Sequence, residues 1–361
     1  MSSVIYGAQG IALGAYKAIS ALQPEKKIEC FLVTAIGNNA SVLGGIPVRE
    51  LKEFAAEKTE DERANIEVFI ATPENVMDDI EKSLDAAGLL KRIRLDSTGW
   101  ANMQGEAFAL TGRFTPLFTY PVGSKFSNVE IYKTLHQKDK PLAFGDVCPK
   151  YLIPLQVGSA LSDIKKTEFV DNEGDNISLK NGNYSELTGL YWIWKNRMNS
   201  DALEDKRKYF GLAHYRRYLE LSEDDFNRLS YNDIDVVLPY PMPYEPNIEV
   251  HHQRYLSAKE WSSVLLALEE KEPEYANAFQ RILKQEYLYN YNIILAKRDV
   301  FEKYCNWLFP ILFRIEELTD PNGTKEPNRY MGYIGESLET LYFMYNKDNL
   351  KIAYAGCKFL T

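Results

Sequence analysis

Residues 208–219 read KYFGLAHYRRYL, and this stretch decides the fold. Its first half, residues 209–213, is an apolar run that is long enough for a buried strand and too short for a helix. Four residues with polar or charged ends follow it directly: His214, Tyr215, Arg216 and Arg217. Open α/β sheets bind ligands just outside the carboxyl ends of their strands. The stretch therefore predicts an α/β fold with a binding site where this strand ends.

The two arginines predict an anionic ligand. The planar guanidinium group matches phosphate oxygens with two parallel hydrogen bonds, so a diphosphate is the expected ligand. Side chains alternate along a regular strand, which places His214 and Arg216 on one face and Tyr215 and Arg217 on the other. The alternative is that both arginines form salt bridges to acidic neighbours.

The segment before this strand, NGNYSELTGLYWIWKN at 181–196, is typical of a helix with a marked start. Asn183 is the predicted N-cap, and Glu186 three residues later is its capping-box partner. Apolar residues then recur at helical spacing, and Trp192 widens the apolar face. This pattern favours a capping role for Glu186 over catalysis, and core packing for the tryptophans over base stacking.

Several blocks of the chain resemble those of a bacterial glycosyltransferase family found in capsule and O-antigen loci, whose characterised members are galactofuranosyltransferases. The blocks keep their order over roughly residues 126–361. They are IPLQVG at 153–158, DNIS at 175–178, the helix at 183–196, GLAHYRRY at 211–218, and the segments 289–312 and 329–342. Gln137 and Ser337 depart from the family pattern, which has lysine and arginine at these positions.

The resemblance implies a GT-A-like, inverting transferase that moves galactofuranose from UDP-galactofuranose to a lipid-linked or oligosaccharide acceptor. Glu336, or else Glu186, is the expected base on the acceptor hydroxyl. For Glu336 the alternative is an acid favoured by the dipole at the start of a helix. The catalytic set also includes His214, Arg216 and Arg217, which would face the diphosphate. The expected substrate-binding residues are His136, Gln156, Asp175, Asn176, Asn183, Glu186, Trp192, Tyr215, His252 and Asn292.

Two other functions stay open at this point. One is a transferase of the same fold that uses UDP-galactopyranose or another UDP-hexose. The other is a non-catalytic, sugar-nucleotide-binding assembly subunit, which the additional N-terminal region suggests.

The composition is that of a globular protein. The chain has 361 residues, 45% hydrophobic and 26% charged, which suits two domains. Its net charge of −9 argues against nucleic-acid binding and against general attraction to anionic lipid. The four cysteines have no paired spacing, so neither a zinc site nor a disulfide framework is expected. Without a signal peptide or a membrane span, a cytoplasmic protein is predicted, with membrane contact limited to peripheral association at the inner face.

Residues 1–95 are typical of a small Rossmann-like βαβ domain, with strands at 4–6, 30–33 and 67–71. The glycines after the first strand are loosely spaced, and the second strand ends without the acid that an NAD-binding unit uses. A scaffolding or partner-docking role is therefore favoured over cofactor binding. Residues 96–125 are predicted to form an irregular linker, and residues 126–361 the GT-A-like domain.

In the second domain, a strand at 129–135 is predicted to end at His136, where a nucleotide would bind; the alternative is a surface histidine. Residues 159–182 are expected to form a loop over the site. Asp233 and Asp235 form an Asp-x-Asp pair, but they precede the strand at 236–239 and so belong at the wrong edge of the sheet for a metal-diphosphate site. No cofactor is therefore expected, and Mg²⁺ or Mn²⁺ is not favoured.

The last third of the chain contributes a few candidate polar residues. The adjacent His251 and His252 lack metal-ligand spacing and are expected to line an acceptor cleft. Asn290 and Asn292 lie in a predicted strand at 289–295, where they would bind sugar hydroxyls or brace the backbone. A helix is expected at 299–315, and Glu336 is placed at the start of another.

Overall fold

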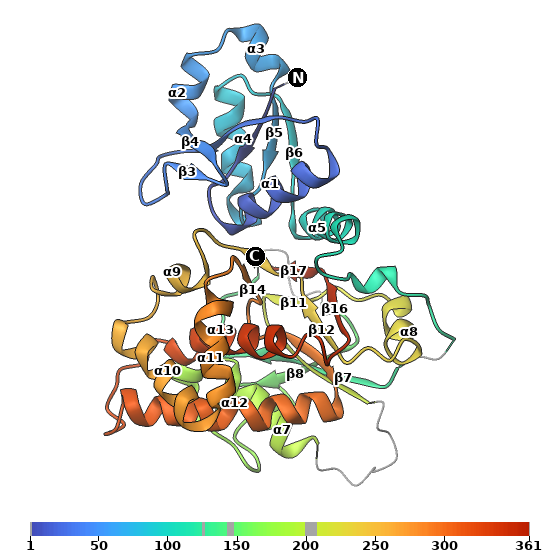
Figure 1. Cartoon of the computed structure of the whole chain (residues 1–361), viewed down its shortest axis with the longest axis vertical. Coiled ribbons are helices and arrows are strands. Elements are labelled where there is room, and N and C mark those ends of the chain that lie inside the picture. The colour runs from blue at the N-terminus through green and yellow to red at the C-terminus, as the bar shows by residue number, and fades with distance from the viewer. Residues whose placement is uncertain (1, 125–126, 143–147, 199–207, 361) are drawn as a thin grey trace.

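The computed structural model describes residues 2–360 except 125–126, 143–147 and 199–207. The described strands form two large sheets flanked by helices, so the α/β prediction is confirmed. Figure 1 shows the N-terminal sheet above the larger C-terminal sheet, with helix α5 (Ser97–Thr111) at the junction. The predicted start of the second domain at Phe126 lies outside the described residues.

The N-terminal sheet contains six described strands in the order β3-β4-β2-β1-β5-β6. All neighbouring strands are parallel except β3 and β4. The strands are β1 (Ser3–Tyr6), β2 (Ile28–Val33), β3 (Val42–Leu43), β4 (Ile46–Glu50), β5 (Glu67–Ile70) and β6 (Lys91–Arg94). The helices of this part are α1 (Gly10–Leu22), α2 (Leu51–Ala56), α3 (Glu60–Asn65) and α4 (Met77–Ala86). The strands predicted near 4–6, 30–33 and 67–71 are confirmed, whereas β6 was not predicted.

The expectation of an irregular linker was wrong for residues 97–111, which form α5. The Asp96 carboxylate caps this helix by accepting a hydrogen bond from the Gly99 amide at 2.7 Å. Gly112 ends it with a left-handed φ of 65°. Trp100 and Phe108 are buried on its inner face. Packing therefore makes a helix of a segment that has mixed local propensity.

The C-terminal sheet is mixed. Its described strands run in the order β16-β12-β15-β10-β7-β8-β9, and β11 and β17 extend it beside β10. The strands β10, β7, β8 and β9 are parallel to one another. The bounds are β7 (Val129–Leu135), β8 (Leu152–Gln156), β9 (Phe169–Val170), β10 (Tyr209–His214), β11 (Arg217–Leu219), β12 (Val236–Pro239), β15 (Ile294–Lys297), β16 (Ile352–Ala355) and β17 (Cys357–Phe359). A separate pair consists of β13 (Met242–Pro243) and β14 (Tyr287–Leu288).

The C-terminal part of the chain contains eight described α-helices (Figure 1). They are α6 (Asn181–Tyr184), α7 (Leu187–Asn196), α8 (Glu223–Tyr231), α9 (Ile248–His252), α10 (Ala258–Lys271), α11 (Pro273–Leu283), α12 (Arg298–Thr319) and α13 (Tyr330–Tyr345). None of the helices in the described part of the chain is long and apolar enough to cross a bilayer.

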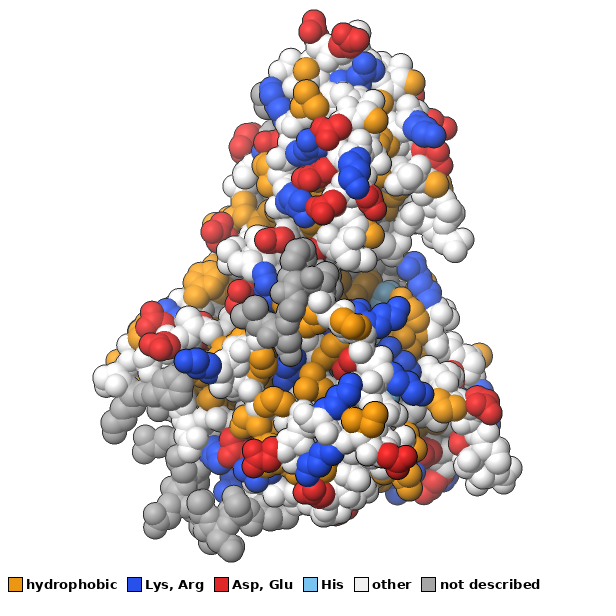
Figure 2. Space-filling view, turned by 180° about the vertical axis from the view of Figure 1, so that it is seen from behind, with side chains coloured by type: hydrophobic (Ala, Val, Ile, Leu, Met, Phe, Trp, Pro, Cys, Tyr) orange, Lys and Arg blue, Asp and Glu red, His pale blue; other side chains and the backbone are white. Residues whose placement is uncertain are grey.

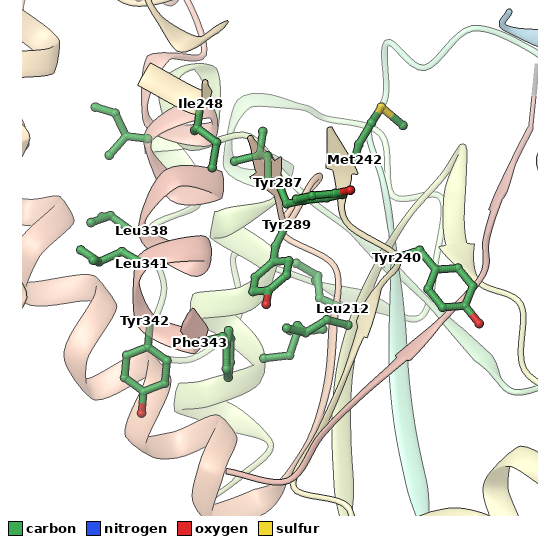
Figure 3. Close-up of a cluster of buried hydrophobic side chains, with 14 of the residues drawn as sticks. Leu212, Tyr240, Met242, Ile248, Tyr287, Tyr289, Leu338, Leu341, Tyr342 and Phe343 are labelled. Atoms are coloured by element: carbon green, nitrogen blue, oxygen red, sulfur yellow. The ribbon is translucent and has the colours of Figure 1, made fainter. Parts of the chain in front are cut away.

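The core fixes α13 against the sheet. Figure 3 shows Phe343 of α13 close to Tyr289 and Leu212 of β10, with Leu338 and Leu341 of the same helix farther from them. Each of these side chains is at most 2% exposed, and burying a side chain of this size contributes roughly 1.5–3 kcal/mol. A helix anchored in this way holds its polar residues at constant positions relative to the end of β10.

Candidate functional site

A cavity of about 480 Å³ lies at the carboxyl end of β10. Acidic, basic and imidazole side chains line it from several elements: Glu186, His214, Arg217, His251, His252, Arg329 and Glu336. Aromatic and amide side chains complete the C-terminal wall: Tyr244, Tyr255, Asn290, Tyr291 and Tyr333. Figure 2 shows lysine and arginine side chains beside a histidine in the hollow between the upper and lower parts of the molecule. This composition is typical of a binding site for a polar, anionic ligand.

The strand end itself makes a tight hairpin. His214 is the last residue of β10, and it pairs with Arg217, the first residue of the antiparallel strand β11. Opposed residues in an antiparallel pair project from the same face, and both side chains line the cavity. The predicted alternation was therefore wrong, because a two-residue turn at Tyr215 and Arg216 interrupts the regular strand.

The two guanidinium groups lie on aromatic rings. Arg217 Cζ is 4.3 Å from the ring centre of Tyr291, and Arg216 Cζ is 4.9 Å from that of Tyr215. Within the described residues neither group lies within 4.0 Å of a carboxylate, so the salt-bridge alternative finds no support there. Arg216 lines an adjoining cavity of about 460 Å³, which Arg217 also lines. Both guanidinium groups are therefore positioned to bind an anion in the cavities that they line.

Glu186 faces the cavity instead of capping a helix. One of its carboxylate oxygens accepts a hydrogen bond from Asn292 Nδ2 at 2.7 Å and lies 3.8 Å from His214 Nε2. Ser185 has a left-handed φ of 51°, which separates α6 from α7 and ends the continuous helix that the sequence predicted. Asn183 Oδ1 accepts a hydrogen bond from the Asn328 amide at 3.0 Å. The capping-box prediction was therefore wrong for both residues.

The surroundings of His214 favour the neutral form of its imidazole. Burial lowers the pKa of its imidazole, and this effect exceeds the opposing effect of the Glu186 carboxylate. Among the described residues its Nε2 atom has no hydrogen-bond partner. An unpartnered ring nitrogen at this position can form a hydrogen bond with a ligand.

Glu336 lies in the middle of α13, six residues after the helix begins, and the prediction of a helix start there was wrong. The dipole alternative therefore does not apply. Its Oε2 atom is 3.8 Å from His252 Nε2, and the other ring nitrogen of His252 is hydrogen-bonded to Ser337 Oγ at 2.5 Å. Ser337 thus orients the imidazole that faces Glu336. One turn later Glu339 is fully buried, and burial raises its pKa well above the usual range.

The predicted strand at 289–295 is broken. β14 ends at Leu288, β15 begins at Ile294, and Tyr291 and Asn292 between them have left-handed φ values of 77° and 51°. Such values are rare for residues other than glycine and cost on the order of 1–3 kcal/mol each. The break turns Asn290 and Tyr291 toward the cavity and Asn292 toward Glu186.

His251 and His252 both reach the cavity, although they are adjacent in the chain. His251 stacks on Tyr244 with ring centres 3.6 Å apart, and burial lowers its pKa to about 3. His252 is fully buried. Their predicted place beside a cleft agrees with this geometry, whereas their binding role stays a prediction.

Arg329, Tyr255 and Tyr333 are cavity residues that the sequence reasoning missed. Arg329 has a left-handed φ of 64° before α13, and its Nε donates to Ser185 Oγ at 3.1 Å. Tyr255 and Tyr333 stack with ring centres 4.8 Å apart. Arg329 and Tyr333 belong to the block at 329–342, which resembles the glycosyltransferase family. That resemblance is the signal in the sequence that could have identified them.

Other predicted ligands have structural partners away from this cavity. His136 follows β7, and its Nδ1 accepts a hydrogen bond from the Lys138 amide at 3.1 Å. Gln156 is buried at the end of β8, where it donates to the Ile164 carbonyl at 2.7 Å and accepts from the Lys166 amide at 2.6 Å. Gln156 therefore shapes the loop that follows β8.

The predicted loop residues near 175 hold that loop to α7. Asp175 accepts a hydrogen bond from the Tyr191 hydroxyl at 3.0 Å, and Asn176 donates to the Gly174 carbonyl at 2.9 Å. Trp192 is buried and donates to the Glu173 carbonyl at 2.9 Å. The structure does not bring these side chains into the cavity, and the core role expected for the tryptophan holds.

The Asp-x-Asp pair lies at the opposite edge of the sheet, as its place before β12 predicted. Lys297 Nζ binds Asp233 Oδ1 at 2.6 Å and Asp235 Oδ1 at 2.8 Å. In the part of the chain that the structure describes, no group of three or more His, Cys, Asp or Glu side chains is arranged to hold a metal ion.

Comparison with known proteins places the C-terminal region in a family. Residues 130–347 match the family described as "Domain of unknown function (DUF4422)". The chain belongs to the DUF4422 family. A search of curated proteins found no match for it.

The DUF4422 chain is also similar to a solved structure, the apo form of the WbbM bifunctional glycosyltransferase. The two share 28% sequence identity with a TM-score of 0.54, and the match covers 65% of this chain. The chain spans 45% of the WbbM chain that it matches.

Proposed function

We propose that this DUF4422 protein is a glycosyltransferase that moves galactofuranose from UDP-galactofuranose to a saccharide hydroxyl during surface-polysaccharide synthesis. The observation that carries the proposal is the joint presence of Glu186, Glu336, Arg217 and Arg329 in one cavity beyond β10. Glycosyl transfer requires both a base and relief of charge on the departing diphosphate. The similarity to WbbM supports the reaction class, and a GT-A-like domain is part of the proposal.

The arginines would receive the diphosphate. Arg217 is held on the Tyr291 ring, and Arg329 is fixed by its bond to Ser185, so both cations are positioned before the ligand arrives. Preorganised charges stabilise a developing anion without reorganisation during the reaction. This arrangement needs no metal ion, so we expect turnover to persist in excess EDTA. Turnover that depends on added Mg²⁺ or Mn²⁺ would contradict this part of the proposal.

Glu336 would act as the base. Glu186 already accepts a bond from Asn292, whereas Glu336 lies beside the unpartnered Nε2 of His252. In the proposed step Glu336 takes the proton from the acceptor hydroxyl. The hydroxyl oxygen then bonds to the anomeric carbon, while the bond from that carbon to UDP breaks and its electron pair leaves on the diphosphate. Attack opposite the leaving group inverts the anomeric centre.

The test is release of UDP from a panel of UDP-hexoses by the purified chain, with product mass and anomeric configuration determined. We expect turnover of UDP-galactofuranose, with Arg217→Ala strongly impaired. Arg94→Ala is the matched control, because Arg94 is 44% exposed and pairs only with Asp78 and Glu81 among the described residues. Preference for UDP-galactopyranose would favour the alternative function, a transferase of the same fold that uses that donor. UDP binding without turnover of any donor and acceptor tried would favour the assembly subunit.

A further inference from the structure

The N-terminal sheet has a topological switch point. Its parallel strands are ordered β4-β2-β1-β5-β6. After β1 the chain adds β2 and β4 on one side of β1, and it then crosses to add β5 and β6 on the other side. Open parallel sheets bind ligands in the crevice beyond the carboxyl ends of the two strands at such a point. Here these strands are β1 and β5, which pair directly.

The loops after β1 and β5 line the cavity that contains Arg217 and Glu336. They contribute residues 7–11 and 71–73 to its wall. Gly7 has a φ of 127°, and a Cβ atom there would lie 2.5 Å from the Ala71 carbonyl oxygen. Glycine therefore allows the two loops to approach each other at the switch point. The site described above thus has two walls, one from each sheet.

The amino end of α1 opens on this cavity. The helix has 13 residues, its N-cap Gln9 makes no capping hydrogen bond with its side chain within the described residues, and its first turn contains no acid. Free backbone N–H groups and the helix dipole favour an anion at this position.

A second, independent observation also points to a ligand in the cavity. His252 is fully buried and Asn290 is 5% exposed, and both line the same cavity. His252 Nε2 and Asn290 Oδ1 have no hydrogen-bond partner within the described residues. Buried polar atoms are normally paired, so these atoms are expected to gain partners when the cavity is filled.

Direct contacts hold the two walls in place. Gly10 packs so closely on β13 that a Cβ atom there would be 2.9 Å from the Met242 side chain. Glu245 accepts a hydrogen bond from the Gly44 amide at 2.8 Å, and Lys17 pairs with Glu286 at 2.8 Å. The amino end of α1 is therefore fixed opposite the strand end that carries Arg217.

We propose that the N-terminal unit forms one half of the binding site. In this arrangement the amino end of α1 and Arg217 hold the diphosphate of one nucleotide sugar from opposite sides. The nature of the ligand rests on the proposed function. The adjoining cavity shares Thr72 and Arg217 with the first and adds Lys140 and Arg216, so an extended ligand finds further cations there. This role replaces the scaffolding or docking function favoured for residues 1–95.

The test compares two variants that differ only in charge, Ala8→Asp and Ala8→Asn. Ala8 lines the cavity and is partly exposed, so either side chain can be accommodated. An acid beside the start of a helix stabilises the helix but repels an anion bound there. We expect the Asp variant to bind UDP at least about tenfold more weakly than the Asn variant, by titration calorimetry at low ionic strength, with an equal or higher melting temperature.

The other results each overturn the inference. Equal UDP affinity in the two Ala8 variants, together with lost binding in Arg217→Ala, would leave the proposed function intact but remove the N-terminal unit from the site. Unchanged UDP affinity with reduced turnover in the Asp variant would place Ala8 beside the acceptor instead. Wild-type protein that neither binds UDP nor turns over any UDP-hexose would remove both this inference and the proposed function.

Discussion

Replacing Arg217 tests the central contact of the proposed site. Its guanidinium stacks on Tyr291 at 4.3 Å, and within the described residues it has no carboxylate within 4.0 Å. Removing it therefore leaves no buried carboxylate unpaired. The lost cation–π contacts with Tyr291 and Phe359 amount to about 0.5–1 kcal/mol each, so Arg217→Ala should fold with a melting temperature within a few degrees of the wild type.

The expected effect on catalysis is much larger. A hydrogen bond to a charged partner contributes about 1.5–3 kcal/mol, and an arginine fork can make two of them to a phosphate. A loss of about 3 kcal/mol or more corresponds to at least about a hundredfold in kcat/KM. Arg217→Lys keeps the charge but loses the fork and the planar stacking, so its activity should lie between those of the wild type and the Ala variant.

The assay is steady-state release of UDP from the preferred UDP-hexose, with circular dichroism and thermal unfolding for each variant. Arg94→Ala serves as the matched arginine control and should keep full activity. If folded Arg217→Ala retained kcat/KM within tenfold of the wild type, the diphosphate would not depend on this guanidinium and the reasoning would fail.

Three further predictions address the base, the strained loop and the buried histidine. Glu336→Gln should lower kcat by about 10²–10⁴-fold, and a loss smaller than about tenfold would assign the base elsewhere. Asn292→Ala should lower the free energy of unfolding in urea by about 2–4 kcal/mol, because it removes the hydrogen bond to Glu186 and places alanine at a left-handed φ of 51°. Asn292→Gly should lower it by less, because glycine adopts this φ without strain. Equal losses in the two variants would rule out a backbone contribution. Burial lowers the pKa of His251 to about 3, so the unfolded chain binds a proton at this residue more tightly than the folded chain does. The contribution of His251 to the free energy of unfolding is therefore fully present above about pH 6.5 and is lost as the pH falls toward 3. Relative to His251→Gln, the wild type should lose roughly 1–2 kcal/mol between pH 7 and pH 5 in urea unfolding, and parallel pH profiles would contradict this.

The sequence by itself predicted the main strands and the end of the sheet where the candidate cavity lies. The runs at 209–213 and 236–239 are apolar and short, which is the pattern of strands buried in a sheet. The placement of His214 and Arg217 at a strand end followed from the same local reasoning. The edge assigned to Asp233 and Asp235 followed from their position before a strand.

Only the tertiary structure decided which polar residues meet. Glu186 is hydrogen-bonded to Asn292, which lies 106 positions away in the sequence. Tyr291 adopts a left-handed conformation that no local sequence pattern predicts. The linker at 97–111 became a helix because α1 and the C-terminal sheet bury its apolar side chains. The second wall of the cavity comes from residues 7–11, which the family match at 130–347 does not include. Local sequence determines strands and helices through burial periodicity. A cavity between two sheets depends instead on contacts between distant segments, and those contacts leave no periodic signal in the chain.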